Sequence, residues 1–117
     1  TTDTAALTAI GNDYGFERVF ERQVHALWSS SLDVLLVLTT SGNSGNLLSA
    51  IYAAMSRNMT CVAMTGGDGG LVAQALSKGP HIEIRVRSRD TARIQEIQLV
   101  LLHCLCEAIE NDDDPGR

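Results

Sequence analysis

The stretch that decides the fold is Asp33-Val34-Leu35-Leu36-Val37-Leu38, which continues directly into Thr39-Thr40-Ser41-Gly42-Asn43-Ser44. Its first half is apolar almost throughout, which is typical of a strand that is covered on both faces of a sheet. Its second half is polar, contains a glycine and precedes a helical pattern over residues 44–57. A strand, a polar turn and a helix in this order predict the start of a β-α-β unit.

The same alternation of strand and helix continues along the chain. It predicts strands at 60–65 and 81–86 and helices at 16–28, 70–76 and 91–110. The last strand alternates apolar and charged residues, so we expect it at an edge or with one wet face. Because β-α-β units connect parallel strands by right-handed crossovers, the sequence predicts an α/β fold with a parallel sheet and helices on both faces. Three strands are few for such a fold, so we expect the N-terminal part of the domain to be missing from this chain.

Length and composition limit what the chain can be. Its 117 residues are enough for one domain, of which we expect 1–110 to be the C-terminal portion and 111–117 to be a disordered acidic tail. The core must be aliphatic, because 44% of the residues are hydrophobic and only 4% are aromatic. The net charge of −5 argues against direct binding of nucleic acid, and no apolar run reaches the roughly 20 residues that span a membrane. An odd count of three cysteines suits a reducing cytoplasm, where we expect the protein to work.

Four hydroxyl side chains make the loop at 39–44 the first candidate for a ligand site: Thr39, Thr40, Ser41 and Ser44. In open α/β sheets, ligands bind beyond the carboxyl ends of the strands. Free N–H groups and the dipole at a helix N-terminus favour an anion there, and hydroxyls add further donors. The loop therefore predicts a phosphate site. The alternative is that Ser44 simply caps the helix. An ATP-type P-loop is excluded because no Gly-Lys-Ser/Thr follows.

A second loop, Thr65-Gly66-Gly67-Asp68-Gly69-Gly70, follows the next strand. A dinucleotide-binding fingerprint would need a further glycine where Val72 stands, so that match fails. We interpret this loop as a tight turn in which Asp68 caps the following helix.

The last helix carries an apolar stripe that we expect to be buried, formed by Ile94, Ile97, Leu101, Leu102, Leu105 and Ile109. Cys104 and Cys106 point in different directions on a helix, so they cannot easily share a metal, and we interpret both as buried packing residues. His25 and His81 have no companion ligands nearby and are expected at the surface. A single histidine on a helix, such as His103, is more often a packing or interface residue than a ligand.

Four segments taken together resemble the phosphoheptose isomerase family of sugar isomerase (SIS) domains: Ala-Ile-Gly-Asn-Asp-Tyr-Gly-Phe at 9–16, Thr-Thr-Ser-Gly-Asn-Ser at 39–44, Met-Thr-Gly-Gly-Asp-Gly-Gly at 64–70 and Ala-Arg-Ile-Gln-Glu at 92–96. They occur in the family's order and cover the chain to about residue 110. The resemblance implies a flavodoxin-like parallel sheet and a homotetramer. It also implies conversion of sedoheptulose 7-phosphate to D-glycero-D-manno-heptose 7-phosphate for lipopolysaccharide heptose.

The resemblance also implies roles for particular residues. Asn12 and Asp13 match a substrate-binding pair, and Thr39, Thr40, Ser41 and Ser44 match the loop that grips the phosphate. Gln95 matches a residue that contacts substrate and a zinc ion, and His103 matches a zinc ligand and catalytic acid/base. On an ideal helix, however, Gln95 and His103 lie about 12 Å apart along the axis and roughly 80° apart around it. One ion binds both only if the side chains lean toward each other; otherwise two subunits contribute.

Two departures from the family pattern bear on these expectations. The family's upstream motif, Gly-Asn-Gly-Gly-Ser followed by a His and a Glu, is absent from this chain, and it supplies the other zinc ligands and the second catalytic group. This chain alone is therefore expected to be inactive. In addition, Gln98 stands where the family often has His.

A sister branch of the family binds the replication initiator DnaA and shares nearly all these motifs. The run Cys104-Leu105-Cys106 resembles that branch, whereas His103 stands where its best-known member has Asn. We therefore favour the isomerase, with a DnaA-binding regulator as the alternative. A non-catalytic module that senses sugar phosphates remains a third interpretation, because it needs only the Ser/Thr loop.

Overall fold

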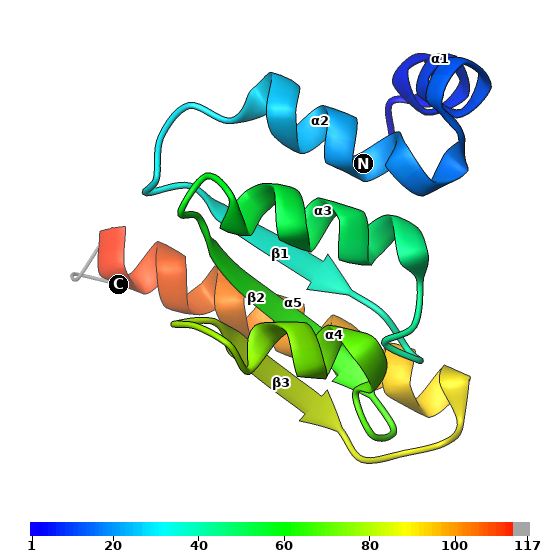
Figure 1. Cartoon of the computed structure of the whole chain (residues 1–117). Helices are drawn as coiled ribbons and strands as arrows, with labels where there is room; N and C mark the ends of the chain where they lie inside the picture. The colour runs from blue at the N-terminus through cyan, green and yellow to red at the C-terminus, as the bar shows by residue number, and fades with distance from the viewer. Residues whose placement is uncertain (114–117) are drawn as a thin grey trace.

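A computed structural model describes residues 1–113 as a parallel sheet between layers of helices (Figure 1). In chain order the elements are α1 (Thr4–Tyr14), the 3-10 turn η1 (Phe16–Arg18), α2 (Val19–Leu27), β1 (Val34–Leu38), α3 (Gly45–Met55), β2 (Thr60–Gly66), α4 (Gly70–Leu76), β3 (Ile82–Val86) and α5 (Thr91–Asp113). The three predicted strands are all present, and helix α1 was not predicted.

The sheet has the order β1-β2-β3, and both pairings are parallel. Leu38 pairs with Met64, and Met64 pairs with Ile84, so the carboxyl ends of the strands lie along one edge of the sheet. Helices α3 and α4 cover one face, α5 lies on the other, and α2 packs outside α3 (Figure 1). The predicted α/β fold with a parallel sheet and helices on both faces is confirmed. The third strand lies at an edge of the sheet that the described residues form, which is one of the two placements predicted for it.

The main core fills the space between the sheet and helices α3 and α4. Its buried members are aliphatic or sulfur-containing, as the composition predicted: Val37, Ile51, Ala54, Met59, Cys61, Ala63, Val72, Ala75 and Leu76. Alanines on the inner side of α3 allow the helix to lie close to the strands. Burial among these side chains raises the pKa of the Cys61 thiol to about 11, which keeps it a neutral packing group.

Helix α5 differs from its prediction in two ways. It ends at Asp113 instead of residue 110, so the first three residues of the predicted acidic tail are helical, and 114–117 lie outside the described residues. Residues 111–113 contain no glycine or proline, so their backbones do not stop the helix. The predicted stripe is buried only at its start: Ile94 is 3% exposed, whereas Ile97, Leu105 and Ile109 are exposed.

The length of α5 explains the exposure of Leu105 and Ile109, which lie in its second half. A helix of 23 residues is about 35 Å long, whereas the strands of five to seven residues reach roughly 17–23 Å. The second half of α5 therefore extends beyond the sheet, and the prediction that Cys104 and Cys106 are buried is wrong, because both are exposed in this chain.

The two remaining histidines differ. His25 is exposed, as expected. His81 is half-buried instead, because its Nδ1 accepts a hydrogen bond of 3.2 Å from the backbone N–H of Cys61. Among the helices of the described residues, none is long and apolar enough to cross a membrane.

Candidate functional site

A pocket of about 500 Å³ opens at the carboxyl end of β1, where the loop at 39–44 meets α5. The loop contributes all four hydroxyl residues of the sequence prediction, Thr39, Thr40, Ser41 and Ser44. Helix α5 contributes Gln95, Gln98, Leu99 and Leu102, and Leu38 and Leu47 complete the lining. The structure therefore brings five of the predicted substrate-binding residues to one place: the four hydroxyl residues and Gln95.

The loop holds its shape through hydrogen bonds from its own backbone. Thr39 Oγ1 accepts from the N–H of Gly42 at 3.0 Å, and Ser41 Oγ accepts from the N–H of Asn43 at 3.2 Å. Gly42 has a φ of +69° and lies so close to the carbonyl of Gly69 that a Cβ atom would collide with it. The hydroxyl oxygens of Thr39 and Ser41 are thus fixed as acceptors, and their O–H hydrogens can still donate to a ligand.

Ser44 occupies the N-cap position of α3, but its side chain makes no capping hydrogen bond in the described structure. The alternative interpretation of this loop, in which Ser44 caps the helix, is therefore wrong. The first turn of α3 keeps N–H groups that the helix itself cannot satisfy. An uncapped N-terminus next to a free hydroxyl is an arrangement that suits an anion.

The pocket is neutral, because none of the side chains that line it among the described residues is charged. An anion would be held here by hydroxyls, backbone N–H groups and the helix dipole instead of by a cation. A carboxylate lies next to the first residue of α3, because a Cβ atom at Gly45 would collide with the carboxylate of Glu17. Glu17 does not line the pocket.

Helix α5 is seated against the end of β2 by two side chains one turn apart. Ile94 contacts Gly66 so closely that a Cβ atom there would approach Ile94 Cδ1 to 2.5 Å. Gln98 is only 4% exposed, and its Nε2 donates to the carbonyls of Thr39 and Met64, both at 3.0 Å. No role in the site was predicted for Gln98 from the sequence. A polar residue one turn after a buried isoleucine was the signal that could have identified it.

Three predicted site residues do not reach the pocket within this chain. Asn12 and Asp13 lie near the end of α1, which packs against η1 and α2, and Asn12 Nδ2 donates to Asp13 Oδ1 at 2.8 Å. His103 is exposed on α5, one residue beyond Leu102, and does not line the pocket.

The described residues do not fit a zinc site on their own. They contain no group of three or more His, Cys, Asp or Glu side chains placed to hold a metal ion. Gln95 and His103 would supply two donors at most, whereas zinc sites use three or four protein ligands.

The glycine-rich loop at 66–70 forms the predicted tight turn, but Asp68 is not the N-cap of α4: that position is Gly69, and it has no side-chain capping hydrogen bond. Asp68 Oδ1 accepts from the N–H of Gly70 at 3.0 Å, at the start of α4. Asn43, from the neighbouring loop, adds a second contact that was not predicted, because its Oδ1 accepts from the N–H of Leu71 at 3.1 Å. The two loops therefore brace each other through Gly42 against Gly69 and through Asn43 against α4.

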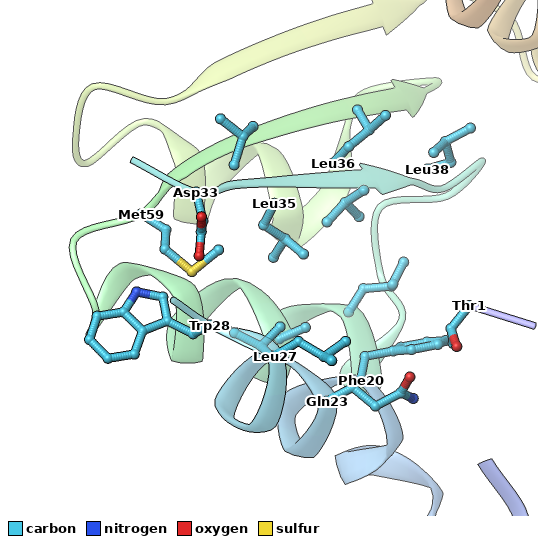
Figure 2. Close-up of a pocket in the computed structure, with 15 residues that line it drawn as sticks. Thr1, Phe20, Gln23, Leu27, Trp28, Asp33, Leu35, Leu36, Leu38 and Met59 are labelled. Carbon is cyan, nitrogen blue, oxygen red and sulfur yellow. The ribbon is translucent and has the colours of Figure 1, made fainter. Parts of the chain in front are cut away.

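A second cavity, of about 640 Å³, lies between α2 and β1 (Figure 2). Leu35 points toward α2 in this view, whereas Leu36 and Leu38 project from the other side of β1 (Figure 2). The lining is mostly apolar, and the carboxylate of its one acidic member, Asp33, already accepts from the N–H groups of Ser29 and Ser30. This cavity is larger than the pocket lined by the loop at 39–44 and α5, which we call the Ser/Thr pocket, but it offers few polar groups to bind a polar ligand.

Comparison with known protein families identifies the family to which this fold and pocket belong. The model of the SIS domain matches residues 1–66, which include α1, β1, the Ser/Thr loop and β2. The chain belongs to the SIS domain family. The match covers the hydroxyl loop and ends at the last residue of β2, whereas the α5 residues that complete the pocket lie beyond the matched segment.

Relatives with high identity are known as both sequences and structures. This SIS domain is 52% identical over 110 residues to phosphoheptose isomerase of Shewanella denitrificans and 53% identical to that of Shewanella baltica. These matches cover 94% of this chain and 55% of each relative. The structure of phosphoheptose isomerase GmhA from Neisseria gonorrhoeae matches with a TM-score of 0.88 and 50% identity over 92% of this chain and 59% of that one. A phosphoheptose isomerase from Francisella tularensis has the same TM-score at 45% identity, over 94% of this chain and 59% of that chain. The chain thus spans a little more than half of the relatives it matches.

Proposed function

We propose that this SIS domain binds the phosphate of a sugar phosphate in the Ser/Thr pocket and forms part of a phosphoheptose isomerase. The observation that carries the proposal is the neutral pocket in which four hydroxyl residues surround the uncapped N-terminus of α3. Relatives more than 50% identical bear the name of this enzyme, which supports the choice of substrate class. The reaction is the conversion of sedoheptulose 7-phosphate to D-glycero-D-manno-heptose 7-phosphate, a step toward lipopolysaccharide heptose.

The proposed chemistry moves a proton between adjacent carbons of the sugar. One group removes the proton from carbon to give an enediol, and another group manages the proton on oxygen. We assign one of these roles to His103, because an imidazole can both take and give a proton. The second group, a carboxylate, would come from outside this chain. Gln95 lines the pocket and is placed to contact the sugar beyond the phosphate.

We also propose that the active assembly is a homotetramer. Several large apolar side chains of α5 are exposed in the single chain, from 37% at Leu105 to 63% at Ile109, with Ile97, Leu99 and Val100 between these values. A helix that is apolar on several sides needs cover on several sides, and a second subunit would supply it. In such an assembly Asn12 and Asp13 act on a sugar phosphate held by another subunit. Light scattering of the full-length protein at micromolar concentration is expected to give four chains per particle, and a monomer would contradict this proposal.

Zinc is proposed as the metal of the full assembly, with Gln95 and His103 as this chain's contribution. Its chemistry would be that of a Lewis acid, which polarises a carbonyl oxygen. Because two donors do not make a zinc site, the remaining ligands must come from other segments or subunits. Equilibrium dialysis of the full-length protein tests this proposal. We expect bound zinc to be lost in the His103→Asn variant, and equal zinc content in both proteins would remove His103 from the ligand set.

The experiment that tests the function compares wild type with His103→Asn in the full-length protein. An isomerase needs the imidazole, and loss of an acid/base group costs about 10²–10⁴-fold in rate. The assay couples heptose product to a kinase that phosphorylates it. His25→Asn is the matched control, since His25 is exposed and its Nδ1 accepts from Arg57 Nε, remote from the pocket. Turnover that is lost in the first variant and kept in the second supports the proposal, and equal turnover contradicts the role of His103.

The alternative function is regulation of replication by binding DnaA. The observation that favours it is the exposure of His103, Cys104 and Cys106 together on α5, which leaves this surface open to a protein partner. If wild type shows no isomerisation with zinc supplied, binding to DnaA is the next measurement. Both functions belong in the cytoplasm, and three free cysteines are consistent with that compartment.

A further inference from the structure

Gln98 is the most deeply buried polar side chain of the Ser/Thr pocket. It is 4% exposed, compared with 8% for Thr39, and the nearby Gln95 is exposed. A buried amide is retained in a protein when each of its polar atoms has a partner, because an unpaired one costs free energy. Its partners therefore show what the side chain is for.

Both donors of the Gln98 amide are committed to backbone carbonyls. Nε2 donates to the carbonyl of Thr39, just past β1, and to that of Met64, near the end of β2, each at 3.0 Å. The same Met64 carbonyl also accepts from the N–H of Thr39 at 3.0 Å. The orientation of the amide is thus fixed by the structure, because the flipped amide would place its oxygen against two carbonyl oxygens.

The amide oxygen is left as a free acceptor. Oε1 accepts no hydrogen bond from the described residues. Every side-chain oxygen or nitrogen of these residues that is fully shielded from solvent has a hydrogen-bond partner, so Oε1 is not fully shielded. Since Gln98 lines the Ser/Thr pocket, Oε1 is open to the contents of that pocket. An acceptor in this position repels the oxygens of a phosphate dianion and attracts an O–H group.

We propose that Gln98 is a binding residue for the polyol part of the ligand, and that its Oε1 accepts a hydrogen bond from a sugar hydroxyl. The pocket then divides into a phosphate end at the hydroxyl loop and the N-terminus of α3, and a hydroxyl end at Gln98. The inference rests on the proposed sugar-phosphate function and adds a specificity-determining residue to it. Gln98 thereby links recognition of the sugar to the position of the loop that holds the phosphate.

The test compares two probes, sedoheptulose 7-phosphate and inorganic phosphate, by calorimetric titration of the full-length protein. In the Gln98→Met variant, which keeps length and loses the amide, we expect the Kd for the sugar phosphate to rise about 3–10-fold. The Kd for inorganic phosphate is expected to rise clearly less, because phosphate does not use Oε1 and feels only the loss of the two donors to the Thr39 and Met64 carbonyls. Gln74→Met, on the exposed side of α4, is the matched control and is expected to change neither constant.

Each other outcome decides against the proposal in a distinct way. If Gln98→Met weakens both probes equally, Gln98 only holds the loop and the inference is wrong. If wild type binds neither probe, the proposed function fails together with it. Should the Met variant not fold, Gln98→Lys keeps donors for the two carbonyls and removes the acceptor. That variant is expected to lose sugar-phosphate affinity while binding inorganic phosphate at least as well as wild type, and undiminished binding of the sugar phosphate would overturn the inference.

Discussion

Two loops leave the carboxyl edge of the same sheet, and they differ in how they use their polar groups. In the glycine-rich loop at 66–70 the one acidic side chain, Asp68, accepts a hydrogen bond within its own turn, from the N–H of Gly70. The Ser/Thr loop at 39–44 closes its turn with Thr39 and Ser41 and leaves Ser44 without a capping bond. A position at the end of a strand therefore does not make a site. A site also needs hydrogen-bond donors that the fold leaves unused, and the Ser/Thr loop at 39–44 has such donors.

The largest expected effect comes from the place where the two loops touch. In Gly42→Ala the new methyl group would collide with the carbonyl of Gly69, and alanine would have to adopt the φ of +69° that Gly42 has. The steric cost and the cost of the backbone conformation therefore add. We expect the free energy of unfolding to fall by about 2–4 kcal/mol, from the backbone conformation and from overpacking. Urea denaturation of the full-length protein measures this change.

Gly67→Ala is the matched control for Gly42→Ala. Gly67 has a similar φ of +63°, but its nearest neighbour would be 3.8 Å from the new Cβ. The free energy of unfolding of Gly67→Ala should fall only by the cost of the backbone conformation, about 1–2 kcal/mol. Equal losses in the two variants would show that the loops do not brace each other.

The next effect separates ligand binding from stability at Ser44. In the Ser44→Ala variant we expect affinity for sedoheptulose 7-phosphate to fall by about 1–2 kcal/mol, because a hydrogen bond to a charged group is lost. The free energy of unfolding should change by less than about 0.5 kcal/mol, since Ser44 does not cap α3. Calorimetric titration and urea denaturation give the two numbers. Unchanged affinity would remove Ser44 from the phosphate site, and a stability loss of 1 kcal/mol or more would indicate a capping role (~1 kcal/mol for a typical cap).

Much of this contrast could be predicted from the sequence, and the reasons for the rest are physical. The apolar run at 34–38 indicated a strand of a parallel sheet, and four hydroxyls after it indicated the pocket, because both signals are local. Burial along α5 was mispredicted, because it depends on how far the sheet reaches beneath the helix. The role of Gln98 depends on two carbonyls 59 and 34 residues away, a coincidence that only the folded chain reveals.

A fall in pH should destabilise the fold through Glu83, next to the glycine-rich loop, more than through the Ser/Thr pocket, which has no titratable side chain among the described residues. Arg85 donates to both oxygens of Glu83 and, with the buried Thr65 hydroxyl, lowers the pKa of Glu83 below its usual value. A lowered pKa adds stability above the unfolded-state pKa, and this stability is lost as the pH falls through the folded-state value. Between about pH 5 and pH 3, wild type should lose about 0.5–1 kcal/mol more than Glu83→Gln, the range of a partly exposed ion pair. Urea denaturation across this pH range tests the difference, and parallel pH profiles for the two proteins would contradict the assignment.

The smallest effect is expected at Asp68, and it sharpens the distinction between the two loops. Asp68→Asn keeps a side-chain oxygen that can accept from the N–H of Gly70, so the turn is preserved. It removes a negative charge near the start of α4, which is worth about 0.3–0.5 kcal/mol at an exposed position. Affinity for sedoheptulose 7-phosphate should stay within about twofold of wild type, because Asp68 lies outside the lining of the Ser/Thr pocket and its polar atoms serve its own turn. The measurement is the same titration as for Ser44→Ala, made side by side. If both variants weaken binding equally, the glycine-rich loop is part of the site, and the difference between the loops lies elsewhere than in their unused donors.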